Sequence, residues 1–183
     1  MKIENHWLTQ AHKVPSPNFD DRPIDEPVSL IVVHCISLPP EQFGGNYIDQ
    51  LFCNQLNPDE HPYFKDIHQL KVSAHLLIKR TGGVTQYVAF NKRAWHAGQS
   101  VYNKRQKCND FSIGIELEGS ENQCYTRQQY EMLISVSHSL LDSYPGLSPL
   151  QVVGHSDIAA GRKKDPGPYF DWNLYLSSIK NQR

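Results

Sequence analysis

The clearest hydrophobic pattern along the chain is a set of short β-branched runs separated by loops rich in glycine and proline. Residues 29–36 are apolar on both faces, which predicts a strand in the middle of a covered sheet. Residues 73–79 and 84–90 form two more runs, and the turn Arg80-Thr81-Gly82-Gly83 between them predicts an antiparallel hairpin. Residues 111–118 alternate, so one face is apolar and the other carries Ser112, Gly114, Glu116 and Glu118.

Helical spacing is strongest over residues 126–144, where apolar side chains recur every three or four positions. Thr126 and Gln129 can form a capping box at its start. Shorter helices are predicted over residues 47–53 and from about Trp172, and residues 150–154 predict a buried strand that ends at His155. Together these elements predict an α/β fold in which a central mixed β-sheet is flanked by helices.

Two segments lack such a pattern. Residues 1–27 are polar and rich in proline, which predicts an irregular N-terminal arm over the domain. Residues 38–70 contain Pro-rich turns and a Gly44-Gly45 pair, which predicts a long excursion that walls a cleft. A length of 183 residues suits one core, so we expect residues 1–183 to form a single domain.

Charge and composition narrow the class of protein. The net charge of −1 lacks the basic excess of a nucleic-acid-binding protein. No apolar stretch has the length of a signal peptide or a membrane span, so we expect neither export nor membrane insertion. The cysteines have no CxxC spacing and are expected to be reduced thiols in the cytoplasm: Cys35, Cys53, Cys108 and Cys124.

Three side chains point to a metal site. His34 and His155 both fall at the carboxyl ends of predicted strands, where ligands commonly bind in α/β sheets. Asp165 follows His155 in a loop whose glycines and proline can turn it back toward the strand end. Two imidazoles and a carboxylate would leave the fourth position of a tetrahedral zinc ion free for water, as hydrolysis requires. Spacing alone also allows His34 to be a hydrogen-bonded core histidine, because these ligands form no compact HExxH motif.

Several motifs resemble one known family over nearly the whole chain. In order, they are VVHCISLPP, FGG, SAHLLIKR, RAWHAG, CNDFSIGIELEG and VVGHSDIAAGRKKDPGP. They resemble the zinc-dependent N-acetylmuramoyl-L-alanine amidases, a family that includes phage amidases and animal peptidoglycan-recognition proteins. The VPSPNFDDRP arm, HPYF and the KKDPGPYFDW segment resemble the cytosolic subgroup that recycles anhydromuropeptides in Gram-negative bacteria.

The resemblance implies an amidase fold and a role for several residues. It implies that His34, His155 and Asp165 bind Zn²⁺, that Glu116 is the proton acceptor, and that Lys163 stabilises the oxyanion. Alternation cannot separate positions two apart, so Glu118 is an alternative to Glu116. Lys164, beside Lys163, is expected to face solvent.

Substrate binding is less well defined by the sequence. The resemblance suggests that the cleft is lined by Tyr63, His75, Trp95 and His96, although each also fits a structural role. Lys71, Arg105 and Lys107 are candidates for binding stem-peptide carboxylates, with solvated surface groups as the alternative. The chain departs from the subgroup at Cys35, where Asn is frequent, and at Lys71 and Lys107, where Arg is usual. Because lysine lacks the bidentate fork of arginine, stem-peptide affinity or selectivity can differ.

The functional hypothesis is zinc-dependent hydrolysis of the bond between (1,6-anhydro-)N-acetylmuramic acid and L-alanine in cytosolic muropeptides, by a monomer. This reaction would serve cell-wall recycling and, by consuming a signalling ligand, would affect β-lactamase regulation. The competing hypothesis is a peptidoglycan-binding module without catalysis, because members of the wider family have lost a metal ligand. The presence of Asp165 and Glu116 argues against that alternative.

Overall fold

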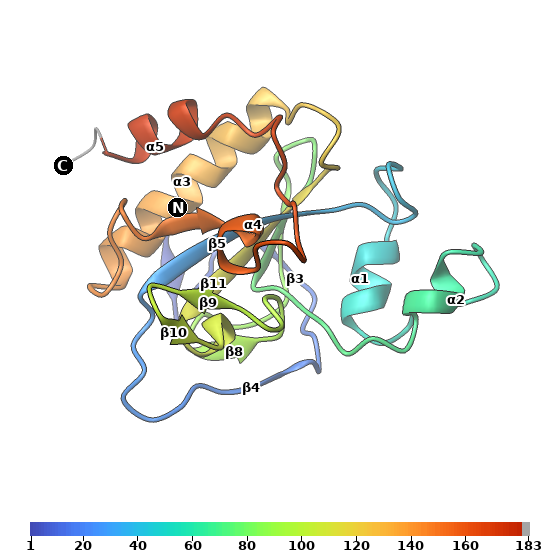
Figure 1. The fold of residues 1–183 in the computed structure, drawn as a ribbon, viewed down its shortest axis with the longest axis horizontal. Helices are drawn as coiled ribbons and strands as arrows, with labels where there is room; N and C mark the ends of the chain where they lie inside the picture. Colours follow the sequence, from blue (N-terminus) through green and yellow to red (C-terminus); the bar gives the residue numbers. More distant parts are fainter. Residues whose placement is uncertain (181–183) are drawn as a thin grey trace.

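The computed structural model describes residues 1–180 and is built around a six-stranded mixed sheet (Figure 1). The strands lie in the order β12 (Val152–Gly154), β5 (Leu30–Ile36), β11 (Ser112–Glu118), β6 (Leu76–Ile78), β7 (Val84–Gln86) and β3 (His12–Lys13). Neighbouring strands are parallel except β6 and β7, which form the predicted antiparallel hairpin. The predicted mixed α/β architecture is therefore confirmed.

The two central strands, β5 and β11, separate two packed layers. Ile31 and Val33 of β5 and Ile113 and Ile115 of β11 pack into the main core on one face. Leu30 and Val32 pack on the opposite face into a smaller cluster with Ala97, Cys108, Phe111 and Ile158. Every residue of β11 is buried, so its predicted polar face is enclosed by protein as well. The polar side chains on that face must find partners inside the molecule.

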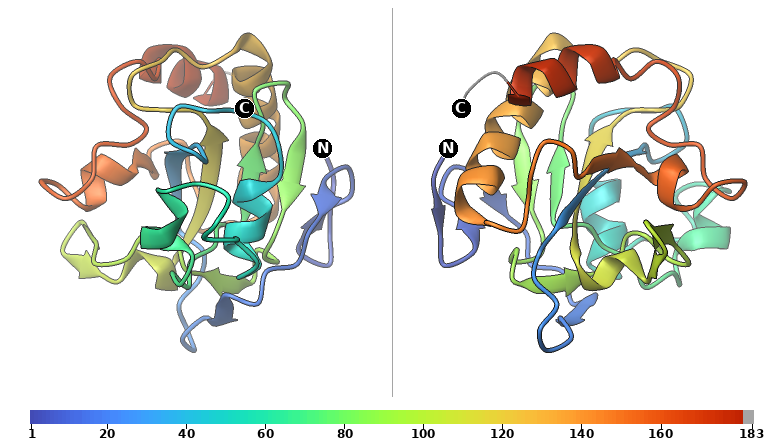
Figure 2. Two further views of the ribbon diagram at one scale, coloured as in Figure 1. Left: turned by 90° about the vertical axis from the view of Figure 1, so that its right-hand side faces the viewer. Right: turned by 60° about the vertical axis from the view of Figure 1, so that its left-hand side comes forward.

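Two helices cover the main core. Helix α3 (Arg127–Ser143) begins with the predicted capping box, in which the Thr126 hydroxyl accepts the Gln129 backbone N–H at 3.2 Å and the Gln129 side chain accepts the Thr126 N–H at 3.1 Å. Helix α5 (Trp172–Lys180) packs beside α3, as Figure 1 and Figure 2 show. Both helices contribute apolar side chains to the core against the sheet, among them Leu133, Leu140, Tyr175 and Ile179. The polar face of β11 thus lies on the side away from α3.

The excursion after β5 forms a separate small layer. It contains the predicted helix α1 (Tyr47–Phe52) and a second helix, α2 (Phe64–Ile67), which the sequence pattern did not predict. The two helices lie side by side in Figure 1 and share an apolar cluster that includes Leu51, Phe52 and Phe64. The same cluster contains Leu77 of β6, so the helices pack on the face of the sheet away from α3. This cluster fixes the excursion against the sheet by burying apolar surface.

The segment between β7 and β11 contains short elements that carry side chains toward the polar face of β11. They are β8 (Lys92–Ala94), β9 (Val101–Tyr102), β10 (Arg105–Gln106) and a 3-10 turn at Cys108–Asp110. Helix α4 (His155–Ile158) follows β12 directly, so His155 is the first residue of a helix as well as the residue after a strand.

The N-terminal arm is more regular than predicted. It contains the paired strands β1 (Ile3–Glu4) and β2 (Trp7–Leu8), the sheet-edge strand β3, and β4 (Phe19–Asp21), which pairs with β8. Beyond β4, the partly buried Arg22 guanidinium donates to the backbone oxygens of Asn109, Asp110, Phe90 and Ser112. These bonds hold the arm against the segment that precedes β11. Among residues 1–180, no helix is long and apolar enough to cross a membrane.

Candidate active site and metal centre

Strand register places the candidate ligands next to one another. His34 of β5 is the register partner of Glu116 on β11, and Val33 is the register partner of Gly154 on β12. Because all three strands are parallel, their carboxyl ends meet at one edge of the sheet, and His155 follows Gly154 there. Glycine is required at position 154, since a Cβ would lie 2.8 Å from Cδ of Pro166.

The two histidines and Asp165 converge on one point. Nδ1 of His34 lies 2.9 Å from Nδ1 of His155, and Oδ2 of Asp165 lies 3.1 Å from each of these nitrogens. All three side chains are buried, and they are the group within residues 1–180 whose atoms are close enough to share a metal ion. The convergence predicted from the sequence is therefore present in the structure.

Backbone contacts turn the Asp165 loop back toward the strand ends. The Asp165 carbonyl accepts the N–H of Ser156 at 2.9 Å, one residue after His155. The carbonyl of Ala97 accepts His155 Nε2 at 3.1 Å and also accepts the Arg162 guanidinium at 2.8 Å. One carbonyl oxygen thus joins a candidate ligand to the loop that carries Asp165.

The donor set fits a cation. His155 must donate from Nε2, because a carbonyl only accepts, so in the neutral ring Nδ1 carries a lone pair. Burial lowers the pKa of His34 to about 4, so this ring is neutral near pH 7. Its Nε2 contacts Nδ1 of His96 at 2.9 Å, which leaves its own Nδ1 facing His155 and Asp165. A metal ion at this point would accept the inward-facing Nδ1 atoms of both rings and one oxygen of the Asp165 carboxylate as ligands.

Glu116 supplies a carboxyl group with a free oxygen beside this centre. It is buried, lines the same cleft, and its Oε2 has no hydrogen-bond partner among the described residues. Burial raises the pKa of Glu116 well above its usual value, and the negative charge of Asp165 raises it further, while Lys163 opposes the shift. A buried carboxyl group with a raised pKa and a free oxygen is suited to accept a proton and return it.

Glu118, the alternative carboxylate, has both oxygens occupied. Its Oε1 accepts the N–H of Gly44 at 2.6 Å and its Oε2 accepts the N–H of Arg80 at 3.0 Å. Glu118 is not among the residues that line the cleft. It therefore connects the excursion and the β6–β7 turn to β11, and the geometry favours Glu116 for chemistry.

The site opens into a cleft of about 420 Å³ whose far wall is the excursion. Leu38, Leu51, Ile67 and Leu70 contribute apolar surface from residues 38–70. Lys163 lines the cleft together with the three candidate ligands, whereas the exposed Lys164 is not part of the lining. An apolar wall opposite a charged centre suits a ligand with both apolar and polar parts.

The predicted substrate-binding residues divide into two groups. Tyr63, Trp95 and His96 line the cleft, together with Cys35. The other four residues do not line it: Lys71, His75, Arg105 and Lys107. Lys71 is exposed and stands in the sequence between the lining residues Leu70 and Val72.

His75 and Arg105 have structural partners. His75 is fully buried, with Nδ1 accepting the Gly114 N–H at 3.0 Å and Nε2 lying 3.0 Å from the Lys92 carbonyl. Arg105 stacks 3.7 Å from the Phe111 ring centroid and pairs with Glu26 at 2.6 Å. Their placement leaves neither side chain directed into the cleft. Sequence patterns could not distinguish these positions, because burial and partner choice depend on distant segments.

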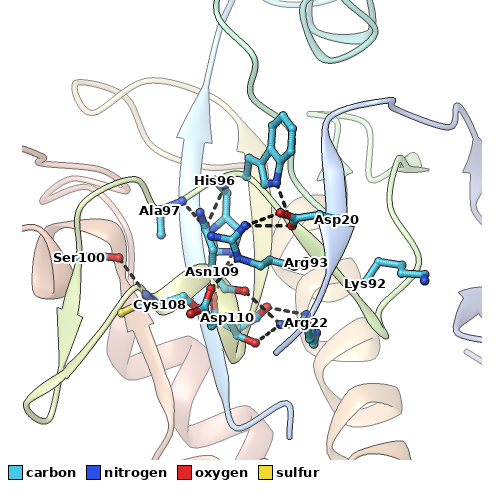
Figure 3. A network of polar contacts seen from close by, with 12 residues as sticks. Asp20, Arg22, Lys92, Arg93, His96, Ala97, Ser100, Cys108, Asn109 and Asp110 are labelled. Carbon is cyan, nitrogen blue, oxygen red and sulfur yellow. Dashed lines mark hydrogen bonds and ion pairs between the residues drawn. The ribbon is translucent and has the colours of Figure 1, made fainter. Parts of the chain in front are cut away.

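Sequence reasoning missed three groups around the candidate ligands: the Ala97 carbonyl, Asn109 and Ser112. Asn109 Oδ1 accepts the N–H groups of His96 and Ala97, at 3.1 and 2.8 Å, and Figure 3 shows both bonds. Ser112 Oγ lies 3.1 Å from Nε2 of His96. The alternation of residues 111–118 placed Ser112 on the face of Glu116, which was the one available signal.

A mixed α/β sheet with two imidazoles, a carboxylate and an unpaired carboxyl at the strand ends is an arrangement that metal-dependent hydrolases use, so the fold and the site together indicate a hydrolase. Comparison with known proteins agrees. Residues 24–168 match the family model of the N-acetylmuramoyl-L-alanine amidases. The 1,6-anhydro-N-acetylmuramyl-L-alanine amidase AmpD of Escherichia coli strain K12 is 55% identical over 182 residues, covering 100% of this chain and 99% of that protein. The chain therefore belongs to the N-acetylmuramoyl-L-alanine amidase family.

Solved structures agree with this assignment. A crystal structure of a selenomethionine AmpD derivative superposes with a TM-score of 0.95 at 52% identity, covering 98% of this chain and 99% of that chain. AmpDh3 of Pseudomonas aeruginosa, in complex with an anhydromuramic pentapeptide, has a TM-score of 0.61 at 30% identity and covers 82% of this chain and 59% of that chain. Both the fold and the hydrolase class expected from the sequence are confirmed.

Proposed function

We propose that this protein hydrolyses the amide bond between 1,6-anhydro-N-acetylmuramic acid and L-alanine in muropeptides, with a zinc ion held by His34, His155 and Asp165. The observation that carries the proposal is the unpaired, buried carboxyl oxygen of Glu116 beside the three converging ligand atoms. The full-length similarity to a protein named as an anhydromuramyl amidase supports the substrate.

The choice of zinc rests on donor chemistry. Two imidazole nitrogens and one carboxylate oxygen form a set that zinc accepts in catalytic sites, with a fourth position left for water or substrate. Magnesium and calcium prefer all-oxygen sets, so they fit this site less well. When bound, zinc supplies a Lewis acid that acidifies water and polarises a carbonyl group.

Two residues of the cleft, Glu116 and Lys163, are assigned to proton transfer and to charge stabilisation. We assign Glu116 Oε2 as the group that accepts a proton from the attacking water and returns it to the leaving amine, because its pKa is raised and the oxygen is free. We assign Lys163 to stabilise the negative charge that develops on the amide oxygen, since its side chain lines the same cleft. Asp165 lies buried and faces both rings, which suits a ligand better than a base.

Substrate position follows from the cleft. Tyr63 and Trp95 offer aromatic surface for the sugar, and the Trp95 indole is held by a hydrogen bond to Asp20 at 3.1 Å. We assign the exposed Lys71, adjacent in the sequence to two cleft-lining residues, to a carboxylate of the stem peptide. We also propose that the protein acts as a monomer in the cytoplasm during cell-wall recycling. Its activity would then affect β-lactamase induction indirectly. All four cysteines are free thiols, which agrees with a reducing compartment.

A digest of defined anhydromuropeptides, read by mass spectrometry, tests the proposal. Zinc-loaded protein is expected to release the intact stem peptide, and chelated protein or the Asp165→Ala variant is not. Product from metal-free protein at an undiminished rate would contradict the metal assignment.

The alternative is a module that binds peptidoglycan fragments without cleaving them. The free Glu116 oxygen disfavours it, because binding alone does not need a buried carboxyl group without a partner. Muropeptide binding by metal-loaded protein with no product would favour this alternative.

A further inference from the structure

The dipeptide His96–Ala97 contacts both candidate histidine ligands from the side away from the metal position. The His96 ring contacts His34 through its Nδ1, at 2.9 Å from His34 Nε2. The Ala97 carbonyl contacts His155 through Nε2 of that ring, at 3.1 Å. Two adjacent residues therefore receive the outward nitrogens of two ligands that are 121 residues apart in the sequence.

A chain of hydrogen bonds fixes which nitrogen carries each proton. Ser112 Oγ has a single hydrogen and donates it to the Cys108 carbonyl at 2.6 Å, so toward His96 it accepts. His96 Nε2 then carries the donated hydrogen, and in the neutral ring Nδ1 is an acceptor. His34 must in turn donate from Nε2, so its Nδ1 is left as a lone pair toward His155 and Asp165. The chain of hydrogen bonds therefore runs from the Cys108 carbonyl through Ser112 and His96 to the candidate ligand His34.

Two features of the surrounding chain hold this arrangement in place. Asn109 Oδ1 accepts both backbone N–H groups of the dipeptide, as Figure 3 shows. Gly114, between Ser112 and Glu116 on β11, leaves room for the His96 ring, because a Cβ there would lie 2.4 Å from Cγ of His96. The His96 ring thus packs against Gly114 on the polar face of β11, and Ser112 on the same face accepts the hydrogen of His96 Nε2.

We propose that His96, with Ser112 and Asn109, is a positioning unit that sets the tautomer and orientation of the two histidine ligands, so that both present Nδ1 to the metal. This role deepens the proposed zinc chemistry and rests on it. It also reassigns His96, because both ring nitrogens are engaged within the protein and none is left to bind substrate. Partners of this kind commonly change metal affinity when they are removed.

The first test compares His96→Leu, which removes the acceptor, with His96→Asn, which keeps an oxygen near the position of Nδ1. Zinc affinity is measured by competition with a chromophoric chelator. We expect His96→Leu to bind zinc about 10- to 100-fold more weakly than the unaltered protein, and His96→Asn to recover at least about tenfold of that loss. Equal zinc affinity of His96→Leu and the unaltered protein would overturn the proposal.

The second test reads the protons directly in metal-free protein. Long-range ¹H–¹⁵N correlation spectra distinguish the two neutral tautomers of a histidine ring. We expect His34 to be protonated at Nε2 in the unaltered protein and to become a mixture of tautomers in Ser112→Ala and His96→Leu. An unchanged His34 spectrum in both variants contradicts the proposal, whether or not zinc binds.

Matched variants separate positioning from general damage. Ser137→Ala removes another buried serine hydroxyl, which bonds to Leu133 and Tyr175 far from the ligands, and zinc affinity should not change. Asn109→Ala should weaken zinc binding, and Asn109→Asp, which keeps an oxygen acceptor, should restore it. If His96→Leu does not fold, the Asn109 pair and Ser112→Ala decide the question. Failure of the unaltered protein to bind zinc would instead contradict the proposed function, and the tautomer spectra would still test the positioning.

Discussion

His34 and Glu116 are register partners on the adjacent parallel strands β5 and β11. A candidate metal ligand and a carboxyl group with a free oxygen therefore leave the sheet side by side. Their relative position is set by the ladder of backbone hydrogen bonds in the centre of the sheet, where both strands are buried. Rigid strands hold such a pair more accurately than loops do.

The first prediction concerns Glu116. In Glu116→Gln the side chain keeps its shape but cannot accept a proton, so we expect kcat to fall by about 10²- to 10⁴-fold. Zinc affinity should stay close to that of the unaltered protein, because the three ligands remain. Steady-state hydrolysis of an anhydromuropeptide and chelator competition measure the two quantities.

Glu118→Gln is the matched control, two residues along the same strand. Glu118 accepts two backbone N–H groups, and an amide can accept only one of them without turning a donor toward the other. We expect the free energy of unfolding to fall by about 1–3 kcal/mol, while kcat changes little. If Glu118→Gln lost kcat and Glu116→Gln kept it, the two assignments would be reversed.

The second prediction links the metal to stability. The ligands come from β5, from the start of α4 and from the loop at Asp165, so zinc joins segments that are far apart in the sequence. At a free zinc concentration 100-fold above Kd, the free energy of unfolding should rise by about 2.7 kcal/mol. Urea unfolding with zinc or with a chelator measures this, and Asp165→Ala should lose most of the effect. Identical midpoints with and without zinc would contradict it.

The third prediction is a pH dependence from His75. Burial, the adjacent Arg22 guanidinium and, to a smaller extent, His34 together lower the pKa of this ring to about 3, while the Lys92 carbonyl opposes the shift. The nearest charged or titratable groups are Arg22 and the rings of His34 and His96. The folded state therefore keeps His75 neutral, whereas the unfolded chain takes up a proton below about pH 6.5.

The sign follows from this difference. The stabilising contribution of neutral His75 is complete above about pH 6.5 and is lost as the pH falls toward 3, by about 1.4 kcal/mol per pH unit. Urea unfolding of chelated protein between about pH 4 and 7 should show a shallower pH slope for His75→Gln than for the unaltered protein. Parallel slopes would show that His75 does not contribute.

The fourth prediction separates the two lysines that depart from the subgroup pattern. Lys71 lies beside cleft-lining residues, while Lys107 does not line the cleft and has a left-handed backbone with φ +59°. Asn is substituted at both positions because it tolerates that backbone. Lys71→Asn should raise KM by about fivefold, since one exposed ionic contact contributes on the order of 1 kcal/mol, and Lys107→Asn should leave KM unchanged. An equal effect of both variants would argue against a contact between Lys71 and the stem peptide.

The long regular elements could be predicted from the sequence because their hydrophobic periodicity is local. β5, β11 and α3 each have a pattern that a single packing face explains, and the Thr126 capping box is a local motif. The short pair β4 and β8 could not be predicted, because β4 is exposed along its length and its partner lies about 70 residues away. Such pairing leaves no periodic trace in either segment.

The candidate metal ligands could be inferred because their residue types and strand ends are visible in the sequence. The contacts that surround these ligands, made by the Ala97 carbonyl, Asn109 and Ser112, could not be inferred. They depend on backbone carbonyls and on which groups share an oxygen atom. Glu116 and Glu118 illustrate the limit: alternation puts both on one face, and only the contacts of Glu118 with Gly44 and Arg80 distinguish them. His75 and His96 were likewise equal candidates for lining the cleft, and only the structure shows that His96 lines it and His75 does not.

The oxygen of Ala97 receives both the His155 ring and the guanidinium of Arg162. Arg162 directly precedes Lys163, so the lysine assigned to the reacting amide oxygen is adjacent to a residue that shares a backbone acceptor with the candidate metal ligand His155. A displacement of the Ala97 carbonyl would therefore act on the segments that carry both groups. The opposite wall, residues 38–70, is not tied to this oxygen, so its shape can vary during evolution and alter which fragments enter without disturbing the reacting geometry.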